Sequence, residues 1–214
     1  MNIDRVLIFT GGNLSPKLLD EIEASDYIIG ADRGALFLIE HGIKPHIAVG
    51  DFDSISKEQL EQVRIMSGDT MTCDPIQKDL TDTELAMDIA LNRKPEQILI
   101  IGATGTRMDH TLANIQMLTR GVEQHVQTSI VDLNNYITLT NSSCMIEDKG
   151  YTYVSLLPMT PVVTGIYLEG FQYPLYNATL HLGESLGISN RLTAERGTIK
   201  IDDGLLLIIQ SKDH

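Results

Sequence analysis

The chain has 214 residues, of which 43% are hydrophobic and 21% charged, so it can form one large or two small globular domains, and its composition excludes a disordered protein. The formal net charge of −13 excludes a basic surface for nucleic acid or anionic membranes, although a cation at a carboxylate cluster would still permit a nucleotide. No apolar run approaches the roughly 20 residues of a membrane helix, and two cysteines without metal spacing and an N-terminus without signal-peptide layout predict a cytoplasmic protein.

The first part of the chain alternates short apolar runs with stretches whose apolar residues recur at helical spacing. Leu112, Ile115 and Leu118 show this spacing in one such stretch. Alternating strands and helices are typical of an α/β domain with a mostly parallel, Rossmann-like sheet flanked by helices, which we expect over residues 1–133. The predicted strands are residues 6–10, 27–31, 47–50, 71–73, 98–101 and 129–131, and the predicted helices are residues 34–41, 56–67, 82–92 and 110–120.

After residue 133 the pattern changes to short segments rich in Thr, Val, Ile and Tyr, separated by Gly and Pro. Such segments predict an antiparallel β-sandwich or barrel without helices, which we expect over residues 134–214. The predicted strands are residues 137–140, 144–147, 152–157, 162–168, 177–182, 192–195, 198–201 and 205–210.

Glycines and polar residues follow five of the predicted strands of the first domain. In open parallel sheets, ligands bind beyond the carboxyl ends of the strands, so we expect these loops to form one binding rim. The loops are Gly11-Gly12-Asn13, Asp32-Arg33-Gly34, Asp51-Phe52-Asp53-Ser54, Lys78-Asp79-Leu80-Thr81-Asp82 and residues 102–110.

Asp51 and Asp53 are the sharpest candidates for chemistry. Two carboxylates two residues apart in a loop can point the same way, where they repel each other unless a cation lies between them. Mg²⁺ prefers such oxygen ligands together with waters and substrate phosphates. The pattern therefore predicts a magnesium site, with a solvated acidic loop as the alternative.

Asp79 and Asp82 form a second acidic pair at a predicted helix start. They can add ligands to the same cation. They can equally serve the helix, because Asp79 or Thr81 could cap it and an acidic Asp82 is favoured by the helix dipole.

Phosphate contacts are expected from two glycine-bearing loops. Gly11 and Gly12 allow backbone N–H groups to approach a phosphate, although the loop is neither a P-loop nor a GxGxxG motif. Arg107 suits bidentate contact with phosphate oxygens. The alternative for Arg107 is a structural ion pair with Asp109, and His110 is more typical of a hydrogen-bonding residue at a helix start than of a general base.

The second half offers aromatic residues beside a turn, Phe171, Tyr173 and Tyr176, and a polar loop, Ser189-Asn190-Arg191. The aromatic rings could stack on a flat, cationic heterocycle. They could equally form the core of a small β domain.

Together, these motifs resemble those of the thiamine pyrophosphokinase family. They occur in the family's order and span nearly the whole chain. The matching stretches are Gly11-Gly12, Ala31-Asp32-Arg33-Gly34-Ala35, Gly50-Asp51-Phe52-Asp53-Ser54, Asp79-Leu80-Thr81-Asp82, residues 102–110, Gly170-Phe171-Gln172-Tyr173-Pro174-Leu175 and Gly187-Ile188-Ser189-Asn190.

The resemblance implies an ATP-binding α/β domain, a thiamine-binding β-sandwich, and a homodimer whose active site lies between subunits. It also implies that ATP gives its terminal pyrophosphoryl group to the hydroxyl of thiamine, producing thiamine diphosphate and AMP, with Mg²⁺ as the cofactor. The implied residues are Asp51, Asp53, Asp79 and Asp82 for catalysis and the metal; Arg107 for catalysis; Gly11, Gly12, Asp32, Arg33, Gly34, Thr81, Thr104, Arg107 and Asp109 for ATP; and Tyr173, Ser189 and Asn190 for thiamine.

Two details stay open at this point. Either Asp82 or Asp53 could accept the hydroxyl proton. Animal members of the family carry Trp at the position of Tyr173, and this chain has no Trp, so we expect weaker stacking on the substrate.

Three alternative functions compete with this expectation. The first is a kinase that transfers only the γ-phosphoryl group, and the second is a nucleotide- or thiamine diphosphate-binding module without turnover. The third is the same reaction on a thiamine analogue.

Overall fold

A computed structural model describes residues 4–72 and 80–213. The chain divides between Leu133 and Asn134 into two compact units, each described here by itself. Within the described residues, no helix is long and apolar enough to cross a membrane.

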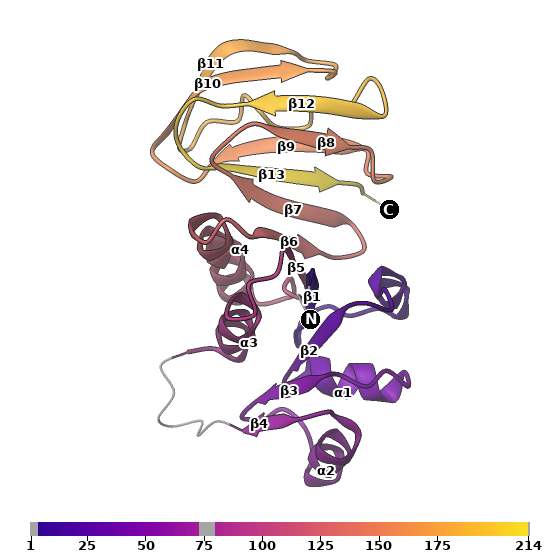
Figure 1. Cartoon of the computed structure of the whole chain (residues 1–214). Coiled ribbons are helices and arrows are strands. Elements are labelled where there is room, and N and C mark those ends of the chain that lie inside the picture. Colours follow the sequence, from indigo (N-terminus) through magenta and orange to yellow (C-terminus); the bar gives the residue numbers. More distant parts are fainter. Residues whose placement is uncertain (1–3, 73–79, 214) are drawn as a thin grey trace. The chain divides into compact units, whose positions relative to one another are not determined.

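Unit 1 contains a parallel sheet with the strand order β4-β3-β2-β1-β5-β6. Its central strands are almost continuously buried because helices cover both faces (Figure 1). The strands are β1 (Arg5–Phe9), β2 (Tyr27–Ala31), β3 (Ile47–Gly50), β4 (Thr70–Thr72), β5 (Gln97–Ile101) and β6 (Gln127–Val131).

The helices of unit 1 lie in two groups, with α1 on one face of the sheet and α3 and α4 on the other (Figure 1). Both α2 and α3 begin with a capping box, in which the side chain of Ser56 or Thr81 accepts a hydrogen bond from the third helical residue. The helices are the 3₁₀ helix η1 (Pro16–Glu21), α1 (Arg33–Glu40), α2 (Lys57–Met66), α3 (Asp82–Leu91) and α4 (Met108–Glu123).

The strand order creates one topological switch point. From β1 the chain proceeds outward through β2 to β3 and β4, and then returns to the opposite side of β1 as β5. In open α/β sheets, ligands bind at such a switch point, beyond the carboxyl ends of the strands, so the loops that follow β1 and β5 mark the expected place of a site.

The predicted elements of unit 1 are all present, with small shifts at their ends. Strands β2 and β3 have the predicted bounds, whereas α4 begins at Met108 instead of residue 110 and ends at Glu123 instead of residue 120. The helix η1 was not predicted. Residue 73 of the fourth predicted strand lies outside the described residues.

Unit 2 consists of two antiparallel sheets, with the strand orders β7-β13-β9 and β11-β10-β12-β8. One apolar core includes Leu156 and Ile208 from the first sheet and Ile166 and Ile199 from the second. Two sheets that share a core form a sandwich, so the choice between sandwich and barrel is settled. The strands are β7 (Asn135–Thr140), β8 (Cys144–Glu147), β9 (Tyr153–Pro158), β10 (Val162–Glu169), β11 (Leu175–His181), β12 (Arg196–Lys200) and β13 (Leu206–Ser211).

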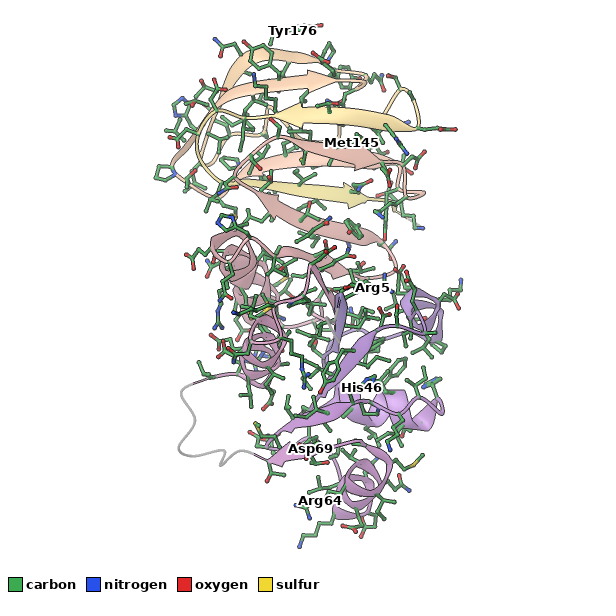
Figure 2. The ribbon with its side chains drawn as sticks, in the orientation of Figure 1. Arg5, His46, Arg64, Asp69, Met145 and Tyr176 are labelled. Carbon is green, nitrogen blue, oxygen red and sulfur yellow. The ribbon has the colours of Figure 1, made fainter. Side chains whose placement is uncertain are left out.

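The predicted strand over residues 192–195 is wrong. Only Leu192 forms a β-bridge, with Phe171, and Thr193 N–H donates to the Gly170 carbonyl. The chain then bends into β12, which pairs with β8 and β10. The strand β11 is an edge strand, and Figure 2 shows Tyr176 projecting from it, with 73% of its surface exposed.

Candidate active site

The loops after β1 and β5 are hydrogen-bonded to each other at the switch point. The Thr10 hydroxyl and the Gly12 N–H both donate to the Gly102 carbonyl, at 2.5 and 2.9 Å, and Asn13 N–H donates to the Thr104 carbonyl at 2.8 Å. A Cβ atom on Gly12 would lie 2.2 Å from the Gly102 oxygen. Only glycine allows the two loops to approach so closely.

A sharp turn after β3 presents Asp51 and Asp53. Gly50 has φ 144° and Phe52 has φ 57°, and these two positive φ angles turn the backbone sharply. The Phe52 ring is 3% exposed and packs among Ala35, Leu36 and Val63. Burial of the central phenyl ring holds the turn, and the two flanking carboxylates remain at the edge of the sheet.

Asp32, which follows β2, lies beside this turn. Its backbone has φ 49° and ψ −121°, a conformation that L-residues rarely adopt. The Ser54 hydroxyl donates to Asp32 Oδ2 at 2.6 Å, whereas Asp32 Oδ1 is buried and has no hydrogen-bond partner among the described residues. One carboxylate oxygen each from Asp32, Asp51 and Asp53 lies within 4.8 Å of the others.

Burial is the main cause that raises the pKa of Asp32, and the negative charges of Asp82 and Asp51 raise it further. The hydrogen bonds from Ser54 and from the Arg33 backbone oppose this shift only in part. Asp32 thus carries its charge at a cost in free energy, which a bound cation would remove.

The start of α3 brings Asp82 to the same place. The Thr81 side chain caps the helix by accepting from Glu84 N–H at 3.2 Å, so the cap that the sequence left open between Asp79 and Thr81 is Thr81. A Cβ atom on Gly50 would lie 3.2 Å from Asp82 Oδ1, which places this carboxylate against the turn after β3. Asp79 lies outside the described residues.

Arg107 and Asp109, at the start of α4, form an ion pair with Nη2–Oδ2 at 2.5 Å. The hydrogen bond from Arg107 lowers the pKa of Asp109 to about 2, and the same contact raises the pKa of Arg107. Both side chains are about two-thirds exposed, so a competing anion can reach the guanidinium.

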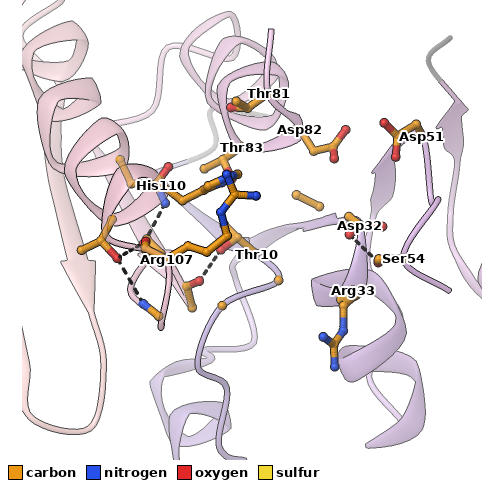
Figure 3. A pocket seen from close by; sticks show the side chains of 18 of the residues that line it. Thr10, Asp32, Arg33, Asp51, Ser54, Thr81, Asp82, Thr83, Arg107 and His110 are labelled. Carbon is orange, nitrogen blue, oxygen red and sulfur yellow. Dashed lines mark hydrogen bonds between the residues drawn. The ribbon is translucent and has the colours of Figure 1, made fainter. Parts of the chain in front are cut away.

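These residues surround one cavity of about 710 Å³ in unit 1. Figure 3 shows Asp32 and Asp51 on one side, Arg107 and His110 on the other, and Asp82 above them. Of the predicted residues that the structure describes, the cavity is lined by Gly11, Gly12, Asp32, Arg33, Asp51, Asp53, Thr81, Asp82 and Arg107.

Three of the residues predicted for ATP are not among those that line the cavity. Gly34 packs against the Phe9 carbonyl, which lies 2.0 Å from where its Cβ would be. The Thr104 hydroxyl donates to Asp132 at 2.7 Å, and Asp109 is held by Arg107.

The structure also adds polar lining residues to which the sequence assigned no role: Thr10, Thr83, Thr111 and Asn114. Ser54 and Thr106, which belong to loops of the expected rim, line the cavity as well. Asn114 lies in the second turn of α4, and its amide donates to the Ala103 carbonyl at 2.7 Å. A polar residue inside a helix gives no sequence signal for this role.

In unit 2, the structure separates the roles of the aromatic residues. Phe171 is 5% exposed and belongs to the core, whereas Tyr173 is 60% exposed. Asn190 is buried and bonds the backbone of Tyr173 through its amide, and Ser189 is exposed with φ 60°. The structure therefore brings Tyr173 and Asn190 together.

Comparison with known proteins gives two domain matches in the order of the two units. The thiamin pyrophosphokinase catalytic domain matches residues 18–130, and the thiamin pyrophosphokinase vitamin B1 binding domain matches residues 143–206. The thiamine pyrophosphokinase of Bacillus subtilis is 36% identical over 210 residues, which cover 96% of this chain and 98% of the relative.

The chain belongs to the thiamine pyrophosphokinase family.

Solved structures of the family have the same fold. The crystal structure of the Bacillus subtilis thiamine pyrophosphokinase has a TM-score of 0.91 at 36% identity, with 98% of this chain and all of that chain covered. The thiamin pyrophosphokinase of Geobacillus thermodenitrificans has a TM-score of 0.88 at 33% identity, with 98% of each chain covered.

The family's catalytic-domain match includes the carboxylate cluster of Asp32, Asp51 and Asp53 and the ion pair at the start of α4. Its vitamin B1 binding domain includes Tyr173 and Asn190. The carboxylate cluster and the ion pair thus lie in the matched catalytic domain and in unit 1, whereas Tyr173 and Asn190 lie in the matched vitamin B1 binding domain and in unit 2.

Proposed function

We propose that this chain transfers the terminal pyrophosphoryl group of ATP to the hydroxyl of thiamine, giving thiamine diphosphate and AMP. One observation carries the proposal: three carboxylates meet after the adjacent strands β2 and β3, at the edge of a cavity of about 710 Å³, in a member of this family. An anionic substrate needs a counter-charge in such a cavity. The two domain matches support the two substrates.

The carboxylate cluster fits Mg²⁺. Asp32 Oδ1 is buried without a hydrogen-bond partner among the described residues, and Asp32, Asp51 and Asp53 each offer one carboxylate oxygen within 4.8 Å of the others. Hard oxygen donors of this kind are the ligands that Mg²⁺ takes together with phosphates and water. Asp51, Asp53 and Asp82 would hold the ion with Asp32, and Asp79 belongs to the same proposed set. When bound, the ion would neutralise the phosphate oxygens.

The phosphates would lie between the joined loops and α4. The backbone N–H of Gly11 and the guanidinium of Arg107 are the proposed donors there, while the N–H of Gly12 donates to the Gly102 carbonyl; all three residues line the cavity. A phosphate would compete with Asp109 for Arg107, because both partners of that pair are exposed. The contacts of Arg33 and Thr81 with ATP are part of the proposal, with Thr81 acting through its backbone while its hydroxyl caps α3.

The reaction forms one P–O bond and breaks another. The thiamine hydroxyl oxygen attacks the β-phosphorus, the bond from that phosphorus to the α–β bridging oxygen breaks, and AMP leaves with the bonding electrons. Asp53 or Asp82 accepts the hydroxyl proton, since both carboxylates line the cavity. Positioning and electrostatic stabilisation supply most of the acceleration in such transfers.

We further propose a cytoplasmic homodimer in which Tyr173 and Ser189 of one subunit complete the thiamine site of the other. Unit 2 exposes large apolar side chains near these residues in the sequence, including Tyr176, Leu182 and Leu186, at 62% or more. Exposed apolar groups of this size are typical of a protein–protein interface. Sedimentation of an active monomer would contradict the shared site.

The decisive experiment uses ATP labelled at the α- or γ-phosphate, with Mg²⁺ and thiamine. We expect the α-label in AMP and the γ-label in thiamine diphosphate, in equal amounts. Appearance of ADP and thiamine monophosphate would support a γ-phosphoryl kinase instead. Tight binding of both substrates without AMP would support a binding module, and a much higher kcat/KM for another alcohol would support an analogue as the substrate.

A further inference from the structure

We infer that Asn190 is a positioning residue that holds the Tyr173 ring for the substrate and does not itself contact the substrate. The inference rests on the proposed function, in which Tyr173 stacks on thiamine. It changes the role that the family resemblance implied for Asn190.

The amide of Asn190 is committed to the protein backbone. Its Oδ1 accepts from Tyr173 N–H and from Arg191 N–H, both at 2.9 Å, and its Nδ2 donates to the Tyr173 carbonyl at 2.7 Å. A side-chain amide oxygen has two lone pairs, so Oδ1 has no capacity left. Asn190 is 5% exposed, so its second amide hydrogen is not presented to a ligand in solution.

The Asn190 side chain extends the antiparallel hydrogen-bond ladder around the bridge between Phe171 and Leu192 by one position, where the backbone is already paired elsewhere. Thr193 N–H bonds the Gly170 carbonyl, and Gln172 N–H bonds the Arg191 carbonyl at 2.8 Å. The next position would need the backbone of Asn190, whose N–H and carbonyl already pair with Val154 in β9. The amide of Asn190 takes its place, because a carboxamide offers the same donor and acceptor as a peptide group.

The segment that carries Tyr173 is thus held at both ends, while its ring stays free. Phe171 is buried against Gly197, where an added Cβ would lie 2.6 Å from the phenyl ring. Tyr173 is held by Asn190 but is 60% exposed, and its hydroxyl accepts from Gln172 Nε2 at 3.2 Å. A fixed backbone reduces the entropy that an exposed ring loses when it stacks on a ligand.

The neighbouring Ser189 is arranged in the opposite way. Its backbone has φ 60°, its N–H donates to Ser155 Oγ at 3.0 Å, and its side chain is exposed. Of the two adjacent residues, Ser189 therefore presents its polar group to solvent and Asn190 directs its amide inward.

A double-mutant cycle tests the inference with the full chain. We expect Asn190→Ala to raise the thiamine KM about 3- to 30-fold, the range for loss of a cation–π stack, with kcat and the ATP KM within about 2-fold. In the Tyr173→Ala background the same substitution should change the thiamine KM by less than about 2-fold. Additive effects would show direct contact between Asn190 and thiamine and would overturn the inference.

A matched control separates positioning from general stability. The Thr160 hydroxyl donates to the Val162 carbonyl and accepts from Leu205 N–H, so Thr160→Ala also removes side-chain bonds to the backbone of unit 2. We expect it to lower the melting temperature without changing the thiamine KM. An Asn190→Ala variant that behaves the same way would overturn the inference. If Asn190→Ala does not fold, Asn190→Asp keeps the acceptor and loses the donor to Tyr173, and the same cycle applies.

A second readout does not depend on the reaction. The chain has no tryptophan, so Tyr173→Trp creates a single tryptophan, which can be excited apart from the tyrosines. We expect Asn190→Ala to lower the fluorescence anisotropy of this Trp in the substrate-free protein, and Thr160→Ala to leave it unchanged. Unchanged anisotropy with Asn190→Ala would overturn the inference even where the proposed function holds. A wild-type chain that forms no AMP, with the anisotropy lowered as expected, would overturn only the proposed function.

Discussion

Like charges repel one another, and Asp32, Asp51 and Asp53 each bring one carboxylate oxygen within 4.8 Å of the others. The buried Asp32 Oδ1, which has no hydrogen-bond partner among the described residues, adds a desolvation cost. A cation bound at these oxygens would offset both costs. This view leads to a test that needs no turnover.

We expect Mg²⁺ at 100 times its Kd to raise the free energy of unfolding by about 2.7 kcal/mol. Asp51→Asn should abolish most of this stabilisation and reduce turnover by orders of magnitude, because it removes a proposed ligand. Urea unfolding with and without Mg²⁺ measures the effect. Glu61→Gln, which removes one exposed charge from α2, is the control and should keep the full stabilisation. Equal stabilisation of the Asp51→Asn variant would contradict the metal site.

A second carboxylate has a purely structural setting. Asp26 is buried, and its two oxygens accept from Arg5 Nε and Nη2 at 2.8 Å, which joins the starts of β1 and β2. We expect Asp26→Ala to cost about 3 kcal/mol, because the partly buried Arg5 would lose its buried carboxylate and keep only the exposed Glu23 and the Glu21 carbonyl as partners. Glu23→Ala should cost less than about 1 kcal/mol, since Glu23 is an exposed partner of the same arginine. Similar losses of unfolding free energy in the two variants would show that burial of the carboxylate does not determine how much each ion pair stabilises the fold.

His46 gives the stability a dependence on pH. Its Nδ1 accepts from Ile28 N–H at 3.0 Å, and burial, followed by the nearby charges of Arg93 and Lys44, lowers its pKa. The unfolded chain, with a histidine pKa of about 6.5, therefore takes up a proton before the folded chain does. Stability from this group is complete above that pH and is lost as the pH falls.

Unfolding in urea at pH 7.5 and pH 5.5 tests this sign. We expect a smaller loss of stability on acidification in His46→Gln, which keeps an acceptor for Ile28 but cannot titrate. An equal loss in the variant and the wild type would assign the pH dependence to other groups.

At the scale of elements, the site depends on how closely the loops after β1 and β5 approach. Gly12→Ala would place a methyl group 2.2 Å from a backbone oxygen, whereas Gly105→Ala in the opposite loop would make only an ordinary contact at 3.7 Å. We expect Gly12→Ala to cost about 1–3 kcal/mol, as overpacking does, and to raise the ATP KM. Gly105→Ala should unfold like the wild type in urea. Equal stability of both variants would show that the loops can separate without cost.

The same scale shows what sequence patterns predict and where they fail. Strands β2 and β3 were predicted with their observed bounds, because continuous apolar runs mark strands buried on both faces. The prediction of a strand over residues 192–195 was wrong because β propensity does not show whether a pairing partner is present, and only Leu192 forms a β-bridge. The capping choice between Asp79 and Thr81 required the observed contact of Thr81 with Glu84.

At the scale of the whole molecule, the proposed shared site makes a prediction about mixtures. Assayed at a thiamine concentration well below the wild-type KM, Asp51→Asn should be nearly inactive and Tyr173→Ala weakly active alone. After mixed refolding, half of the dimers should be mixed, and one of the two sites in each of these should be intact, so about a quarter of wild-type activity should return. Activity of the mixture no higher than the average of the two variants would place both residues in the same subunit's site.

The sequence by itself determined the α/β and all-β halves, the rim of loops at the carboxyl strand ends, and the family. These follow from the spacing of hydrophobic residues and from the order of motifs, both of which can be read directly along the chain. It also indicated which residues could hold a cation, because Asp51 and Asp53 lie two residues apart in one loop, where two carboxylates repel each other unless a cation lies between them.

Only the tertiary structure decided which of these side chains meet. Asp32 joined the carboxylates of the turn after β3, whereas Thr104 bonded Asp132 and Asp109 bonded Arg107. Asn190, which a motif would assign to the ligand, directed its amide into the backbone of Tyr173. A side chain's partner is set by strand register and burial between segments distant in sequence, and no local pattern records that information.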